Sequence, residues 1–188
     1  MAKVLLYNIK NDYDIDKFEK IAYDRGIEII RVGKSDIDQV VGFLLSMEDF
    51  EMKDESLAFD ENLDFPFILF ADFDKSGLFD LLDTMRENNL AIQHKASETA
   101  NNVNWTLREL LIENDKEGKM MGLINNINKL LEKAKGLKEI HGEDPKLKNL
   151  VIEINTYFND QTLFDFEVAK KYYLKLLDEI LRIEEKTK

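Results

Sequence analysis

The chain has 188 residues, of which 44 % are hydrophobic, and it carries a net charge of −12. This length and hydrophobic content suit one domain of ordinary size with an appendage, and they exclude a chain that is disordered throughout. Because the sequence has no cysteine, disulfides, thiol catalysis, thiolate metal sites and iron–sulfur clusters are excluded as well.

The net charge is distributed unevenly. Residues 1–118 contain 13 Lys and Arg against 26 Asp and Glu, whereas residues 119–188 contain 13 against 12. Like-charge repulsion argues against nucleic acid or an anionic membrane as a partner of the acidic part. The sequence also lacks a signal-peptide pattern at its start and an uninterrupted apolar run of about 18 residues, so we expect a cytoplasmic protein with no membrane partner.

The first predicted elements are two strands separated by a helix. Residues 3–9 (KVLLYNI) and 27–32 (IEIIRV) are short apolar runs suited to buried strands. Between them, Asp14 is placed to cap a helix and Gly26 to end it, since glycine tolerates a left-handed backbone.

A second helix is predicted after Ser35, its expected N-cap, with Asp38 as a capping-box partner. The following stretch, residues 48–64 (EDFEMKDESLAFDENLD), carries eight acidic residues against Lys53 alone. We interpret it either as a solvated loop or as an acidic surface that docks a partner or attracts cations.

Two more strands and two more helices complete the first part of the chain. Residues 65–71 (FPFILFA) predict a third strand, and residues 90–93 (LAIQ) a fourth strand at the sheet edge. The helix between them is expected to turn four side chains inward: Leu78, Phe79, Leu82 and Met85. The next helix begins at about residue 104, capped either by Asn104 or by a capping box of Thr106 and Glu109.

This alternation predicts an α/β domain over residues 1–117, with a small, mostly parallel four-stranded sheet sandwiched by helices. We expect the strand order 2-1-3-4. Residues 118–188 show only helical periodicity and predict an all-α C-terminal region, either a helical hairpin or a three-helix unit.

Most catalytic motifs are missing from the sequence. It has no glycine-rich dinucleotide motif, no phosphate-binding loop and no pair of histidines at helical spacing, and we expect both His94 and His141 to be ordinary surface or edge residues.

The remaining catalytic candidate is the stretch ILFADFDKSG (68–77). It places Asp72 and Asp74 after a buried strand, where two carboxylates could hold Mg²⁺, and Asp12 is expected to converge on the same edge. This stretch resembles the first motif of haloacid-dehalogenase-type phosphotransferases and the phosphoacceptor of receiver domains, although the later acids and lysine of those families are missing. The alternative is that Asp74 caps the next helix and Asp72 is solvated.

Trp105 is the only tryptophan. One interpretation is a core anchor, in which case Trp105→Ala should cost about 3 kcal/mol. The other is a small ligand-binding pocket that Trp105 walls, with Asn102 as a hydrogen-bonding group and Lys95 as a charge.

Four stretches resemble the bacterial family called domain of unknown function 3783: VLLYNI (4–9), GFLLSMEDF (42–50), FILFADFDKSGLFDLLDTMREN (67–88) and KASETANNVNWT (95–106). The last is similar to a family pattern of Lys-Ala, Asn and Trp-Thr, here Lys95, Ala96, Asn102, Trp105 and Thr106. The resemblance covers most of residues 3–113 and implies a small compact domain without an established activity. Asp72 stands where members often have a small residue, so the resemblance does not imply the aspartate site.

We therefore expect a non-enzymatic protein without a cofactor, whose C-terminal helices mediate self-association or bind a protein partner. One alternative is a magnesium-dependent phosphoryl or phosphoester enzyme that uses Asp72 and Asp74, with Asp12 nearby. Another is a small-ligand sensor with a pocket around Lys95, Asn102 and Trp105.

Overall fold

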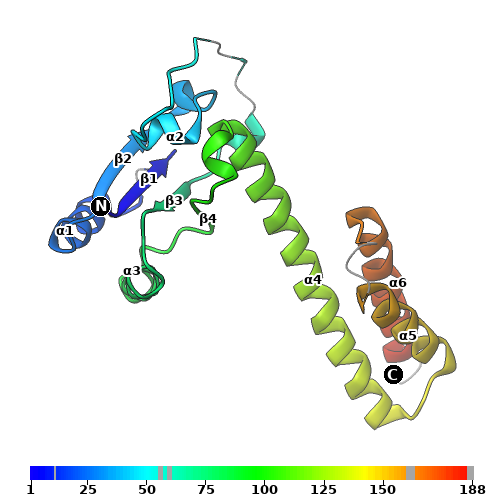
Figure 1. Cartoon of the computed structure of the whole chain (residues 1–188). Helices are drawn as coiled ribbons and strands as arrows, with labels where there is room; N and C mark the ends of the chain where they lie inside the picture. The colour runs from blue at the N-terminus through cyan, green and yellow to red at the C-terminus, as the bar shows by residue number, and fades with distance from the viewer. Residues whose placement is uncertain (11, 55–56, 59–60, 160–163, 186–188) are drawn as a thin grey trace. The chain divides into compact units, whose positions relative to one another are not determined.

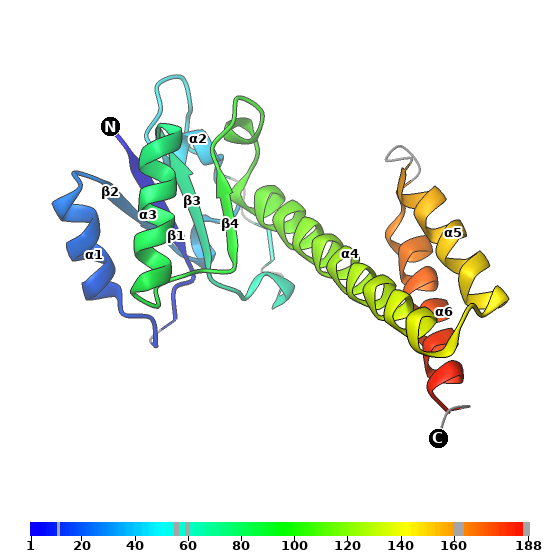
Figure 2. The same cartoon turned by 90° about the horizontal axis from the view of Figure 1, so that it is seen from below.

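The computed structural model describes residues 1–10, 12–54, 57–58, 61–159 and 164–185, and at Glu61 the backbone alone. Its contacts divide the chain into two units, Met1–Lys116 and Glu117–Lys188, called here the α/β unit and the helical unit. The elements are β1 (Lys3–Tyr7), α1 (Ile15–Asp24), β2 (Glu28–Val32), η1 (Lys34–Asp36), α2 (Val41–Leu44), η2 (Glu61–Leu63), β3 (Phe67–Ala71), α3 (Lys75–Glu87), β4 (His94–Ser97), η3 (Asn102–Asn104), α4 (Leu107–His141), α5 (Pro145–Asn159) and α6 (Phe166–Glu185). Figure 1 and Figure 2 label the strands and the α-helices.

The sheet of the α/β unit has the predicted strand order, β2-β1-β3-β4, but it is mixed rather than mostly parallel. β1 pairs with β2 and β3 with β4 in parallel, whereas β1 and β3 are antiparallel. The reason lies in the segment before β3. The Tyr7 hydroxyl donates to the Leu63 carbonyl at 3.0 Å and the Asn8 amide to Asp64 at 2.9 Å, so this segment is held at the carboxyl end of β1 and the next strand must run back.

Both faces of the sheet are covered. Val4, Leu6, Ile68 and Phe70 turn to the face under α1 and α3. Leu5, Tyr7, Phe67 and Leu69 turn to the other face, which is covered by residues 37–45 and the first turns of α4 (Figure 2). The alternation of side chains along each strand thus supplies two separate apolar cores.

The local signals around α1 are confirmed. Asp14 is its N-cap and accepts from the Lys17 amide at 3.1 Å, and Gly26 follows the helix in a left-handed conformation with φ 65°.

The predicted helix after Ser35 is wrong, because only η1 and the four-residue α2 form there. Asp36, not Ser35, accepts from the Gly33 amide at 2.7 Å. The carbonyls of Ile37 and Gln39 accept from the amides of Arg108 and Leu107, at 2.7 and 2.9 Å, so they are unavailable to a helix of their own.

The fourth strand lies four residues later than predicted. Asn89 adopts a left-handed conformation after α3, with φ 59°, and the Leu90 amide bonds back to the Met85 carbonyl at 2.8 Å. This helix-ending motif buries Leu90 beneath the sheet face, so pairing starts only at His94. The buried face of α3 also differs from the predicted one, because Leu81 is buried and Phe79 is exposed.

The helical unit is built from the later part of α4 together with α5 and α6, which share one apolar core. Asp144 caps α5 by accepting from the amides of Lys146 and Leu147, and it also accepts from Arg182 of α6 at 2.8 Å. Asp165 caps α6. Residues 160–163, which precede this cap, lie outside the described residues. Within the described part of the chain, no helix is both long and apolar enough to cross a membrane.

Candidate binding sites

The two aspartates after β3, Asp74 and Asp72, bind a backbone amide and the N-terminal amine, respectively. Asp74 caps α3, with its Oδ1 accepting from the Gly77 amide at 2.7 Å, as the structural alternative predicted. Asp72 has a left-handed backbone, with φ 58°, and its carboxylate pairs with the N-terminal amine of Met1. The hydrogen bond from this amine holds the pKa of Asp72 below its ordinary value.

Asp12 does not join this pair of aspartates. Lys3 lies opposite Ala71 and Tyr7 opposite Phe67, so the end of β3 lies beside the start of β1. Asp12 follows the other end of β1, and four residues at about 3.3 Å each separate these two ends by about 13 Å. The predicted convergence is wrong because it required β1 and β3 to be parallel. Among the described residues, no group of three or more His, Asp and Glu side chains is placed to hold a metal ion.

The proposed pocket around Trp105 contains groups that are already bonded. Asn102 is buried; its Oδ1 accepts from the Thr99 amide at 2.8 Å and its Nδ2 donates to the Ser97 carbonyl at 3.0 Å. The Lys95 ammonium lies on the surface, 3.3 Å from the Ile92 carbonyl. Asn102 therefore organises the loop between β4 and α4.

Trp105 is not the core anchor that the sequence suggested. It is 36 % exposed, and its backbone carbonyl accepts from the Val41 amide at 2.8 Å. Because much of the ring remains in water, Trp105→Ala is expected to cost less than the value for a buried tryptophan.

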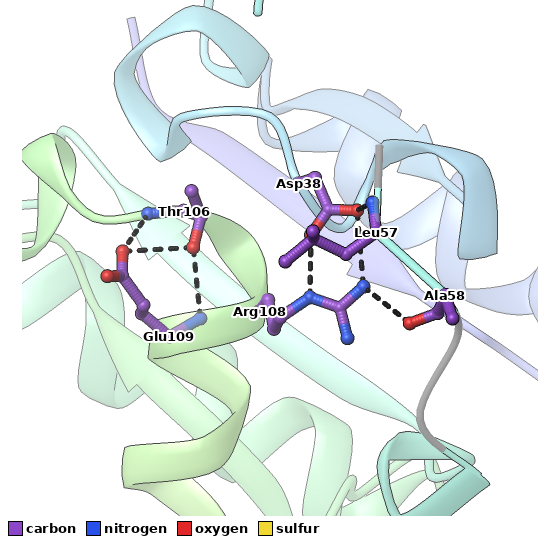
Figure 3. A network of polar contacts seen from close by, with 6 residues as sticks. All are labelled: Asp38, Leu57, Ala58, Thr106, Arg108 and Glu109. Atoms are coloured by element: carbon purple, nitrogen blue, oxygen red, sulfur yellow. Dashed lines mark hydrogen bonds and ion pairs between the residues drawn. The ribbon is translucent and has the colours of Figure 1, made fainter. Parts of the chain in front are cut away.

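Asp38 and Arg108 form an ion pair that the sequence did not reveal (Figure 3). Arg108 Nε donates to Asp38 Oδ1 at 2.6 Å, and Nη2 donates to Oδ2 at 3.1 Å. Both side chains are largely buried. The hydrogen bonds from Arg108 lower the pKa of Asp38 despite its burial, which acts in the opposite direction. The two residues are 70 positions apart in the sequence. The one feature of the sequence that could have pointed to this ion pair is an arginine beside the apolar face of a predicted helix.

The same ion pair anchors the acidic stretch by its backbone. The Leu57 amide donates to Asp38 at 2.8 Å, and Arg108 donates to the Ala58 carbonyl at 3.1 Å (Figure 3). Gln39 likewise binds both the amide and the carbonyl of Lys53, at 2.9 and 2.7 Å. The described acids of the stretch are exposed: Glu48, Asp49, Glu51, Asp54 and Asp64. Residues 55, 56, 59 and 60 lie outside the described part.

A cavity of about 390 Å³ lies at the carboxyl ends of β1 and β2. Three of its polar side chains have partners within the α/β unit: the Tyr13 hydroxyl donates to the Leu90 carbonyl at 3.1 Å, Arg31 pairs with Glu19, and the Asn8 amide binds Asp64. Burial raises the pKa of Tyr13, so its hydroxyl stays protonated and acts as a donor.

A groove of about 810 Å³ lies in the helical unit between α4 and α5. The apolar part of its lining includes Leu131, Ala134, Leu137, Leu147, Val151 and Ile183. The turn 142–145 closes one end, where Glu143 lies 2.7 Å from Lys148 and 3.2 Å from Lys138. The two lysines lower the pKa of Glu143, so the carboxylate is ionised. This groove, which helical periodicity does not predict, is the larger of the two cavities described here.

The family resemblance is confirmed by comparison with known families. Residues 66–121 match the family described as Domain of unknown function (DUF3783). The match includes the stretches 67–88 and 95–106, whereas 4–9 and 42–50 lie outside it. No curated protein and no solved structure matches the chain.

Proposed function

We propose that this chain is a cytoplasmic, non-enzymatic protein-interaction module that self-associates through the outer face of α6. The observation that carries the proposal is a pair of exposed leucines on this helix. Leu174 is 49 % and Leu181 44 % exposed, and seven residues place them almost directly above one another on one face. Large apolar side chains that recur on one face of a helix are typical of an interaction surface.

Two charged residues beside these leucines, Lys170 and Glu185, are complementary between two copies of the chain, which favours a second copy as the partner. Lys170 lies one turn before Leu174, and Glu185 lies one turn after Leu181; both side chains are exposed. If two α6 helices meet antiparallel about a two-fold axis, Leu174 of each copy faces Leu181 of the other, and Lys170 faces Glu185. An isologous contact requires this kind of self-complementarity.

The candidate chemical sites support a binding role over catalysis. Asp74 and Asn102 are engaged in local hydrogen bonds, and Asp72 pairs with the N-terminal amine. Asp12 stands at the other end of the sheet, so the described structure does not bring the three aspartates of the magnesium-dependent alternative together.

The first test measures the mass of the full-length protein by sedimentation equilibrium over a range of concentrations. We expect dimers that dissociate on dilution and on addition of salt, since salt screens exposed charge pairs. Lys170→Glu and Glu185→Lys should each weaken the dimer, because each places like charges opposite one another.

The double variant Lys170→Glu/Glu185→Lys should restore the dimer, since it exchanges the two charges across the axis. Leu174→Glu should abolish association, whereas Ile140→Glu, which changes an exposed isoleucine on α4, should leave it intact. A wild-type chain that stays monomeric at high concentration, or a double variant no better than the single ones, contradicts the proposal.

A further inference from the structure

Lys138 and Lys148 stand at the closed end of the groove with a carboxylate between them. Lys138 belongs to α4, Lys148 to α5, and Glu143 to the turn that joins these helices. Glu143 Oε1 lies 2.7 Å from Lys148 Nζ, and Oε2 lies 3.2 Å from Lys138 Nζ. Two ammonium groups on separate helices are thus spaced to hold one carboxylate.

An apolar channel continues from this pair of lysines. Leu137 and Leu147 form its floor next to the turn, and Leu131 and Val151 line it farther along. Ile152, which also lines the groove, is 54 % exposed. The volume of about 810 Å³ falls within the range of roughly 300–1,000 Å³ that is typical of small-molecule sites, most of which combine apolar walls with a few polar groups.

We propose that this groove binds a long-chain carboxylate. The head group takes the place of Glu143 between Lys138 and Lys148, and the hydrocarbon chain lies along the apolar floor. Lys135 adds a third cation to the lining, and Glu132 and Asp144 add two acids, so the groove keeps one net positive charge once Glu143 has moved aside. This charge favours an anionic amphiphile over a neutral or cationic one.

The groove and the outer face of α6 are separate surfaces. Ile183 is the α6 residue that lines the groove, and nine residues place it about half a turn around the helix from Leu174. Binding in the groove and dimerisation can therefore be tested independently of each other.

The test is isothermal titration calorimetry of the full-length protein with dodecanoate below its micellar concentration. Dodecanol and dodecyltrimethylammonium serve as neutral and cationic ligands of equal chain length. We expect dodecanoate to bind at least about tenfold more tightly than either, since each loses the charge-assisted bonds to the lysines. Decanoate should bind more weakly than dodecanoate by about fourfold per methylene removed.

Two variants identify the head-group site. Glu143→Gln should lower the Kd of dodecanoate, because it removes the internal competitor, and a gain in affinity cannot arise from loss of folded protein. Lys148→Met should raise the Kd about tenfold. Lys129→Met, which changes an exposed α4 lysine outside the groove lining, should leave it unchanged. Absence of dodecanoate binding, equal binding of dodecanol, or a Kd unaffected by Glu143→Gln and Lys148→Met overturns the proposal.

Discussion

A buried carboxylate requires a partner, and Asp38 finds one 70 residues away in Arg108. Asp38 also accepts a hydrogen bond from the Leu57 amide and Arg108 donates one to the Ala58 carbonyl, so three separate pieces of the chain meet at this ion pair. Removal of one partner of such a pair leaves the other charge buried and unpaired.

Asp38→Asn should therefore destabilise the α/β unit by about 3 kcal/mol, since an unpaired buried arginine carries a large desolvation cost. Urea unfolding followed by Trp105 fluorescence measures this loss. Asp80→Asn, which weakens an exposed ion pair with Arg25, is the matched control and should change stability by less than about 1 kcal/mol. Equal effects of the two substitutions would show that the Asp38 pair is not a buried anchor.

The ion pair of Asp38 and Arg108 also determines how the stability of the α/β unit changes with pH. The pKa of Asp38 is lower in the folded state than in the unfolded chain, chiefly because of the hydrogen bonds from Arg108. The stability that it contributes is complete above the ordinary aspartate pKa and is lost as the pH falls toward the lowered, folded-state value. The stability difference between wild type and Asp38→Asn should accordingly shrink in acid.

Among the elements, α4 illustrates how a helix start depends on its neighbours. Thr106 and Glu109 form the predicted capping box: the Glu109 carboxylate accepts from the Thr106 amide at 2.8 Å, and the Thr106 hydroxyl accepts from the Glu109 amide at 3.2 Å. The next two amides, of Leu107 and Arg108, bond to Gln39 and Ile37. Asn104 is not the cap, because it belongs to the preceding turn η3.

Thr106→Ala should cost about 1 kcal/mol, because the Glu109 amide loses its acceptor. Thr106→Ser keeps the hydroxyl and should retain most of the stability. Both are measured by urea unfolding, with far-UV circular dichroism as the signal. If alanine and serine behave alike, the capping box does not stabilise this helix start.

In the whole molecule, each unit has an apolar core of its own, and α4 contributes to both. Leu107, Leu110 and Leu111 belong to the core of the α/β unit, whereas Ile127, Ala134 and Leu137 belong to that of the helical unit. In the described structure of α4, no residue between 112 and 126 is buried. This interruption predicts that the α/β unit and the helical unit unfold as separate cooperative units.

Ile154→Ala tests this prediction in the helical unit. The side chain is fully buried, so its truncation should cost about 2–5 kcal/mol and lower the unfolding midpoint seen by far-UV circular dichroism. Trp105, the sole tryptophan, lies in the α/β unit, and the midpoint of its fluorescence should stay unchanged. Leu69→Ala in β3 should shift the tryptophan midpoint by a comparable amount. Parallel shifts of both signals in both variants would mean that the chain unfolds as one unit.

The sequence by itself determined the features that depend on near neighbours. The N-caps at Asp14 and Asp74, the glycine end of α1 and the capping box at Thr106 all involve groups within about four residues, and apolar patterning was sufficient for the α/β and all-α character. Tertiary structure decided what depends on distant groups. The direction of β3 follows from the hydrogen bond between Tyr7 and the Leu63 carbonyl. The helix expected after Ser35 does not form, because carbonyls in that segment accept from amides more than 65 residues away. Asp72 pairs with the N-terminal amine and Asp38 with Arg108, and both partners are distant in the sequence. Such contacts leave no periodic trace in a sequence, because one polar pair over a long separation changes neither composition nor spacing.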